Sequence, residues 1–315
     1  MKKLSNTKLI GGLFLAASAF VITLIIGIGP IARAVQPTVD LGTAAPFAIL
    51  AGTPNITDAG NTSVINGNVG LSPATGVGIG LFCSQVTGTI YSVDATGPLP
   101  CRVTDGPLLV TAKNNLTAAY TDAANRAPVT IVPTELGGTI LQAGVYGSAS
   151  TTLGITAGAG ALTLDGQNNP SAVFIFQAPF SGTGLTVGNG STISLINGAQ
   201  ACNVFWRVDT ASIGTTANFV GTIMALNSIS VANGATISGR LLARNGSVTL
   251  INDTIAVPTC AGNTTLTNTS NTAVIPGLPN TGLSGGQSSL WFVIPSSIVL
   301  AFLLLAYVGH KKHLI

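Results

Sequence analysis

The stretch FVGTIMALNSISVANGATISGRLLA, residues 219–243, contains one pattern twice. Gly221-Thr222-Ile223-Met224-Ala225 returns eighteen residues later as Gly239-Arg240-Leu241-Leu242-Ala243. Between the two copies lie short runs rich in β-branched residues, separated by Asn and Gly. A fixed period of this length, with three short strands per repeat, is typical of coils that stack into a solenoid. We therefore predict a mainly β protein built as a three-sided parallel β-solenoid.

The same offset extends the pattern in both directions. It carries Phe219 to Ile237 and then to Ile255, and it places Asn203-Val204-Phe205-Trp206 on Gly221-Thr222-Ile223-Met224. Three coils are thus expected between Cys202 and Val257. Longer coils are expected from Ala172 and near the mature N-terminus. An antiparallel sandwich of short strands is the competing fold, but the fixed offset favours the solenoid.

The three sides of the predicted solenoid differ in character. The first strands are apolar on both faces, so their outer face needs a cover. Residues 107–126 place apolar side chains on one helical stripe, with Asp105 or Gly106 available as the cap. We expect this helix to lie along the first side. Residues 72–104 are expected to form an insertion that caps one end.

The second and third strands alternate between apolar and small polar residues, which puts the polar set on exposed flat faces. Inward positions are Leu185, Val187, Ile193, Leu195, Ile213, Phe219, Ile229, Val231, Ile237, Val248, Leu250 and Ile255. Outward positions are Thr186, Thr192, Ser194, Ser212, Asn218, Ser228, Ser230, Thr236, Ser238, Thr249 and Thr254. Coils stack at about 4.8 Å and alternate residues along a strand lie about 6.7 Å apart. The faces are therefore two-dimensional lattices of hydroxyls.

The composition excludes several classes of function. The chain has 315 residues, of which 7% are charged, and the segment 35–281 has six basic residues against nine carboxylates, a net charge of −3. It has no basic patch with interleaved aromatics, so we expect no nucleic-acid partner. The same segment lacks histidine, and its carboxylates are scattered. We therefore predict a protein that is not an enzyme and holds no metal or cofactor.

The N-terminus carries an export signal. Lys2, Lys3 and Lys8 precede an apolar run that ends at Ile31, and Ala32-Arg33-Ala34 supplies an A-x-A cleavage site. Residues 1–34 are thus predicted to be a signal peptide that engages the membrane during export. An uncleaved membrane anchor is the alternative, because the apolar run is long.

The C-terminus resembles the sorting signal of proteins that sortase joins to peptidoglycan. Leu278, Pro279, Asn280, Thr281 and Gly282 precede an apolar segment, 290–308, and a basic tail. The resemblance implies cleavage and attachment to peptidoglycan through Thr281. Residues 261–277 are expected to be a flexible linker. A single-pass tail anchor is the alternative; in both cases the solenoid, residues 35–260, lies outside the cell.

Four cysteines in an exported segment indicate two disulfides. We favour Cys83–Cys101, which is local in sequence, and Cys202–Cys260, which brackets the repeats. Loop closure would stabilise the fold by about 3 and about 4 kcal/mol, respectively.

Several ordered motifs resemble the microbial ice-binding proteins with a discontinuous β-solenoid. They are LTLDGQ at 162–167, AVFIFQ at 172–177, GAQACNVFW at 198–206 and GRLLARNGSVTL at 239–250, with a matching opening over 40–51. The resemblance implies a right-handed solenoid with a helix alongside and the N-terminal coil inserted beside later coils. It also implies that one flat side adsorbs to ice.

Some members of this family carry Thr-(Ala/Gly)-x-(Thr/Asn) near the ice surface. The matching corner here stacks 189–192, 215–218 and 233–236, where only Thr215 supplies the first Thr. We therefore expect moderate activity. The sequence does not decide whether the second or the third side is the ice-binding face. We slightly favour the third side, because it lies next to this corner.

The expected function is adsorption to ice, which inhibits ice growth or recrystallisation or tethers the cell to ice. The physical basis is that uncharged hydroxyls, spaced close to the oxygen layers of ice, can hold water in a patterned layer. The alternative is an adhesin or structural protein of the cell surface without ice activity.

Overall fold

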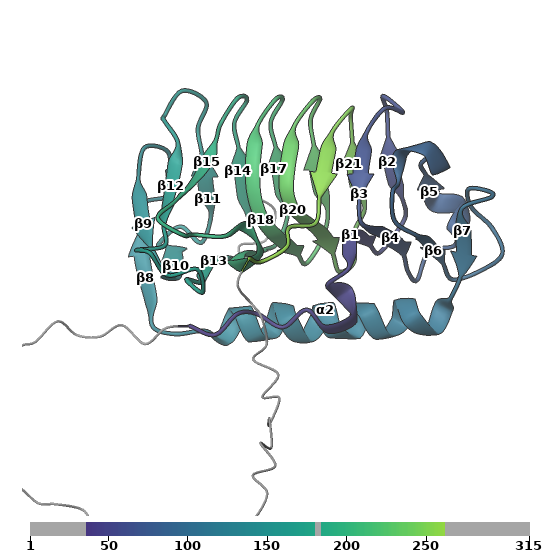
Figure 1. The fold of residues 1–315 in the computed structure, drawn as a ribbon, viewed down its shortest axis with the longest axis horizontal. Coiled ribbons are helices and arrows are strands. Elements are labelled where there is room, and N and C mark those ends of the chain that lie inside the picture. The colour runs from purple at the N-terminus through teal and green to yellow at the C-terminus, as the bar shows by residue number, and fades with distance from the viewer. Residues whose placement is uncertain (1–35, 180–183, 262–315) are drawn as a thin grey trace, which may run out of the picture. The chain divides into compact units, whose positions relative to one another are not determined.

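The computed structural model describes residues 36–179 and 184–261. In this part of the chain, parallel strands stack into a three-sided solenoid with one long helix beneath it (Figure 1). We call the sides first, second and third in the order in which each coil visits them. All neighbouring strands in the three ladders are parallel. The predicted fold class is confirmed.

The first side is the longest ladder. Its strands are, in spatial order, β7 (Arg102–Thr104), β6 (Ile90–Ser92), β4 (Asn68–Leu71), β1 (Phe47–Ala51), β20 (Thr236–Ala243), β18 (Asn218–Ala225), β16 (Val204–Val208), β13 (Phe174–Ala178), β10 (Gly144–Ser148) and β8 (Val129–Val132).

The second side is an unbroken ladder of short strands. In spatial order they are β11 (Leu153–Ile155), β14 (Leu185–Val187), β17 (Ala211–Ile213), β19 (Ile229–Val231), β21 (Val248–Leu250), β2 (Ile56–Asp58) and β5 (Ile79–Gly80).

The third side has two parts joined by a single bridge, Thr192 to Asn218. One part contains β9 (Ile140–Gln142), β12 (Leu162–Asp165) and β15 (Ile193–Ile196); the other contains the first halves of β18 and β20, followed by β22 (Thr254–Ala256) and β3 (Val64–Asn66). Short 3₁₀ turns lie at Gly42–Ala44, Gly76–Gly78, Cys83–Gln85 and Ala201–Asn203.

The coils are not stacked in sequence order. The first coil, β1 to β3, pairs with the last coil of the repeats on all three sides: β1 with β20, β2 with β21 and β3 with β22. Residues 72–104 extend the stack beyond the first coil, and helix α2 (Gly106–Asn125) then carries the chain back along the solenoid to β8 (Figure 1). The insertion of the N-terminal coil, which the resemblance implied, is therefore present.

Helix α2 covers the outer face of the first side, as the apolar first strands required. Its N-terminus is capped by the Asp105 carboxylate, which accepts a hydrogen bond from the Leu108 N–H at 2.9 Å. Leu109, Leu116 and Tyr120 on one helical stripe are buried. The helix stripe and the outward side chains of the first side form one apolar cluster, whose members outside the helix include Leu50, Val145, Val173, Ile175, Phe205, Met224 and Leu242.

A second apolar cluster fills the inside of the coils. Its centre is Trp206, whose ring stacks on Phe176 with centroids 3.9 Å apart and whose indole N–H donates to the Val220 carbonyl at 3.0 Å. Every inward position predicted for the second and third sides is buried except Leu195, which is half-buried. The predicted alternation is thus present on both faces.

One predicted register is wrong. Phe205 pairs with Thr222 and Trp206 with Ile223, an offset of seventeen residues rather than the eighteen that we expected for this step. An offset of eighteen would set Trp206 against Met224, which faces the helix. Because successive residues of a strand face opposite sides, burying the Trp206 ring inside the coil fixes the shorter offset. The following step, from β18 to β20, keeps eighteen.

Candidate functional site

The outward residues of the second side form one continuous row. Thr186 pairs with Ser212, Ser212 with Ser230, Ser230 with Thr249, and Thr249 with Thr57. Gly154 and Gly80 stand at the two ends of the row. Thr186, Ser212 and Ser230 are exposed, while Thr249 and Thr57 are half-buried. Five hydroxyl side chains therefore follow one another at the spacing of parallel strands, about 4.8 Å.

The borders of this row are mostly small as well. On one side lie Ser228 and Ser247, whose carbonyls accept hydrogen bonds from the N–H groups of Ala211 and Ile229 in the preceding coil, and the Ser228 hydroxyl accepts from the Ser247 N–H at 3.2 Å. On the other side lie Gly188, Gly214 and Ala232, followed in register by the exposed Ile251. The row itself contains no charged or large apolar residue, and Ile251 is the one large apolar side chain among these border residues.

The third side has a comparable row with more interruptions. Asn218, Thr236 and Thr254 are paired in register, but Thr192 joins them through the single bridge to Asn218, and exposed Val64 follows Thr254. A parallel row combines the predicted Ser194 and Ser238 with Thr163, Val220, Ala256 and Asn66. Exposed Ile140 and Ile196 and the carboxylate of Asp165 lie at its far end. This side is therefore less uniform in both register and chemistry.

The predicted site residues thus divide between two faces and a corner. Thr186, Ser212, Ser230 and Thr249 lie on the second side, with Ser228 on its border. Thr192, Ser194, Asn218, Thr236, Ser238 and Thr254 lie on the third. Thr215 belongs to neither row, because it lies in the corner and its N–H donates to the Asn189 side-chain oxygen at 3.0 Å.

Sequence reasoning missed Thr57 on the second side and Thr163 on the third. Thr57 alternates between Ile56 and Asp58 like the repeats, but its place in the row depends on the docking of the first coil beside β21. Thr163 lies in a motif that drew attention for its resemblance alone, although it pairs with Ser194.

The carboxylates on the corner between the second and third sides have structural partners. Asp58 accepts hydrogen bonds from the Ser63 N–H at 2.9 Å, the Asn252 N–H at 3.2 Å and the Gln85 amide at 2.6 Å. Burial raises the pKa of Asp58, but these bonds outweigh it and the net pKa is lowered. Asp253 accepts from two backbone N–H groups, yet burial raises its pKa to about 6. Both carboxylates join coils together.

Positive charge collects on the helix side. The guanidinium groups of Arg207 and Arg244 lie 4.5 and 4.9 Å from the Tyr120 ring centroid. Lys113 donates to the carbonyls of Ala243 and Arg244, and burial, with the charge of Arg244, lowers the pKa of Lys113 to about 7. These cations are absent from the two flat faces and serve the packing of the helix.

Other kinds of site find little support in the described ranges. These residues contain no group of three or more His, Cys, Asp or Glu side chains placed to hold a metal ion. A cavity of about 280 Å³ lies between Gln36–Thr38 and Cys260–Ala261, and amides, hydroxyls and apolar groups line it without an ionisable side chain. The described helices include none long and apolar enough to cross a membrane.

Four predicted segments lie wholly or mostly outside the described residues. They are the signal peptide 1–34, most of the linker 261–277, the sorting signal from Leu278 to Gly282 and the apolar segment 290–308. Both favoured disulfides, Cys83–Cys101 and Cys202–Cys260, are present.

An extended row of uncharged hydroxyl side chains on stacked parallel strands defines a protein suited to recognising an extended surface rather than a small molecule in a pocket. Residues 49–256 match the sequence model of the Ice-binding-like family. This match spans more than half of the chain, and the chain belongs to that family. Membership agrees with the prediction of a non-enzymatic protein and gives no support to the adhesin alternative.

Relatives with related names are similar over more than half of the chain. An "Ice-binding protein" from Flavobacterium frigoris is 40% identical over 197 residues, covering 61% of this chain and 67% of that protein. "Ice-binding protein K3-B1" from Typhula ishikariensis is 35% identical over 231 residues, covering 68% of this chain and 88% of that protein.

Solved structures share the fold. The crystal structure of an ice-binding protein from an Antarctic biological consortium matches with a TM-score of 0.61 at 36% identity, covering 74% of this chain and 97% of that one. The corresponding domain of Shewanella frigidimarina ice-binding protein 1 matches with a TM-score of 0.63 at 30% identity, covering 71% and 99%.

Proposed function

We propose that this chain binds ice through its second side. The observation that carries the proposal is the row of Thr186, Ser212, Ser230, Thr249 and Thr57, in register across neighbouring strands. Membership of the Ice-binding-like family supports the ligand, since the similar proteins are named for ice binding. The third side, which the sequence favoured, is the second choice.

Two features support the second side over the third. Its ladder is continuous, whereas the third side narrows to one bridge at Thr192 and Asn218. Its row contains only hydroxyl side chains and glycine, with exposed Ile251 confined to one border, whereas exposed Val64 and Ile140 stand within the rows of the third side. A rigid crystal lattice can contact a flat row at every position, but a protruding isopropyl group or a break in register would hold neighbouring positions away.

The mechanism follows from the chemistry of the row. Each Thr offers a hydroxyl that donates and accepts and a methyl group that excludes water. Such side chains can hold water at strand spacing without the strong field by which a charged group orients the water around it. A face that keeps water in a patterned layer adsorbs to growing ice, and the growth front between adsorbed molecules becomes curved and slows.

Ice-affinity partitioning, thermal hysteresis and recrystallisation assays test this function on the processed chain, residues 35–281. We expect the protein to enter the ice fraction, with a measurable hysteresis gap and smaller crystals after annealing. Exclusion from the ice fraction together with no effect in the other two assays would reject ice binding and favour a surface adhesin.

We also propose that the protein is extracellular and anchored to a cell wall. The pentapeptide Leu278–Gly282, the apolar segment 290–308 and the basic tail support attachment by sortase to peptidoglycan through Thr281. The two disulfides agree with an oxidising location. Muralytic digestion should release the protein joined to wall fragments. A Thr281→Ala variant that still fractionates with the digested wall would contradict the anchor.

A further inference from the structure

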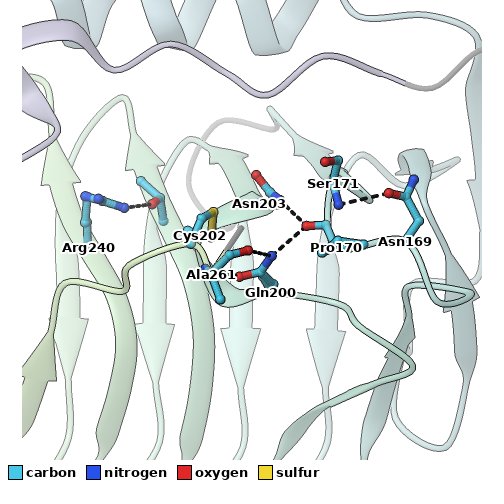
Figure 2. Close-up of a disulfide and its surroundings, with 10 residues drawn as sticks. Asn169, Pro170, Ser171, Gln200, Cys202, Asn203, Arg240 and Ala261 are labelled. Atoms are coloured by element: carbon cyan, nitrogen blue, oxygen red, sulfur yellow. Dashed lines mark hydrogen bonds between the residues drawn. A yellow bond between two sulfur atoms is a disulfide. The ribbon is translucent and has the colours of Figure 1, made fainter. Parts of the chain in front are cut away.

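The described chain ends in a segment that crosses back over the solenoid. After β22, residues Val257–Ala261, which we call the strap, leave the last coil and reach the corner between the third and first sides (Figure 2). Cys260 of the strap is bonded to Cys202, which lies just before β16 in the middle of the ladder of the first side. The strap is therefore attached two coils away from the strand that precedes it.

The Gln200 amide reinforces this attachment. Its side-chain oxygen accepts from the Ala261 N–H at 2.6 Å and its nitrogen donates to the Ala261 carbonyl at 2.9 Å, as a neighbouring strand would (Figure 2). The same nitrogen donates to the Pro170 carbonyl at 2.8 Å, and the Asn203 amide donates to that carbonyl at 3.1 Å. The end of the strap is thus tied to two coils at once.

The strand that the strap bypasses is the one that tension along the chain from Ala261 would reach first. β22 contains three residues and pairs with β20 on one side and β3 on the other, so it joins the repeats to the N-terminal coil on the third side. If tension reached β22 along the chain, its few ladder bonds would break one after another, and the junction would open on this side.

We propose that the Cys202–Cys260 disulfide and the Gln200 amide form a mechanical anchor that delivers tension from the C-terminal side of Ala261 to the corner at β16. The disulfide closes a covalent loop with a sequence separation of 58 that contains β16 to β22, so a pull at Ala261 cannot unravel these coils, with Ser212, Ser230 and Thr249, from their C-terminal end.

The anchor also fits the position of the second side. In a three-sided coil, the corner between the third and first sides lies opposite the second side. A pull at Ala261 is therefore directed away from the row of hydroxyls and through the body of the solenoid. This inference rests on the proposed function, because a wall-anchored protein that holds a cell to ice is pulled between its ice face and its C-terminal attachment.

Single-molecule force spectroscopy tests the anchor without ice. The full chain in mild detergent carries one handle at its C-terminus and one at a clickable residue in place of Asn189, an exposed corner position that precedes the loop. With the disulfide intact, about 50 Å of chain can be drawn out between position 189 and Ala261, against about 260 Å without it. The decisive readout is the force of the first release.

We expect the C202S/C260S variant to release first at a lower force than the native chain, and then in steps of about 60 Å, the length of one eighteen-residue coil. The matched control is C83S/C101S, which lacks the disulfide outside this path and should release at the native force. If C202S/C260S fails to fold, reducing folded C83S/C101S in the trap breaks the same bond. An unchanged first-release force, or an equal drop in the control, overturns the anchor, whereas ice binding is judged separately by partitioning.

Discussion

Replacing Ser230 with Tyr should abolish most of the ice activity without unfolding the protein. Ser230 is exposed at the centre of the row, between Ser212 and Thr249. At a strand spacing of about 4.8 Å, a tyrosine ring there would stand over both neighbours and obstruct three of the five hydroxyl positions. If each position contributes about 0.5–1.5 kcal/mol, as an ordinary hydrogen bond does, the loss is about 1.5–4.5 kcal/mol. Adsorption should weaken at least about tenfold.

Thr236→Tyr is the matched control, because Thr236 is exposed in the same coil but lies on the third side. Thermal hysteresis and ice partitioning should stay within about twofold of native for this variant, and both variants should unfold within about 0.5 kcal/mol of the native chain. Loss of activity in Thr236→Tyr with activity retained in Ser230→Tyr would move the ice face to the third side. Full activity in both would refute the flat-face mechanism.

Four further substitutions test the fold. Gly239→Ala would bring a Cβ within 1.9 Å of the Gly221 carbonyl oxygen, so we expect the free energy of unfolding in denaturant to fall by about 1–3 kcal/mol. Gly190 has a φ of 65° and open space around it, so Gly190→Ala should lower the free energy of unfolding by about 1 kcal/mol. Trp206→Ala removes a buried, stacked ring and should cost about 3–5 kcal/mol in the same assay. The pKa of Asp253 is raised from 3.8 to about 6, so its ionised form destabilises the native state above that pH by up to about 3 kcal/mol, a cost that fades as the pH falls toward 4. Asparagine loses one of the two acceptors for the Ala235 and Ile251 N–H groups at every pH, so Asp253→Asn should compare better with the native chain at pH 8 than at pH 4; a difference independent of pH contradicts this assignment.

The sequence predicted the features that depend on local pattern. The alternation around Ile229 and Ile237 identified the buried and exposed positions, because one face of each strand must be apolar to be buried. The stripe through Leu109, Leu116 and Tyr120 identified the helix and the side that it covers. The pairing of Cys202 with Cys260 followed from their position around the repeats. Each of these rests on residues close in sequence or on a single constraint.

Features that depend on distant contacts could not be predicted in the same way. Nothing in the residues around Thr57 specifies that it extends the row beyond Thr249, since that requires the first coil to dock beside the last. The two-part third side is a similar case, because the break falls where β15 meets β18 through one bridge. Choosing which side binds ice therefore required the register of every coil. The preference for the third side, which rested on the corner motif near Thr215, was made without that register.

The second side also shows why a strict period misleads at the level of single residues. Ser212 to Ser230 is a step of eighteen residues, but Ser230 to Thr249 is a step of nineteen. A strict eighteen would set Ser230 opposite Val248 and turn that apolar side chain into water, because a one-residue slip exchanges the two faces of a strand. The extra residue is placed instead in the corner, where Arg244–Ser247 replaces the shorter Leu226–Ser228. Burial of Val248 thus keeps Thr249 in the row. Extra residues are inserted in the corners, because an insertion within a strand of the flat face would reverse which side chains are buried.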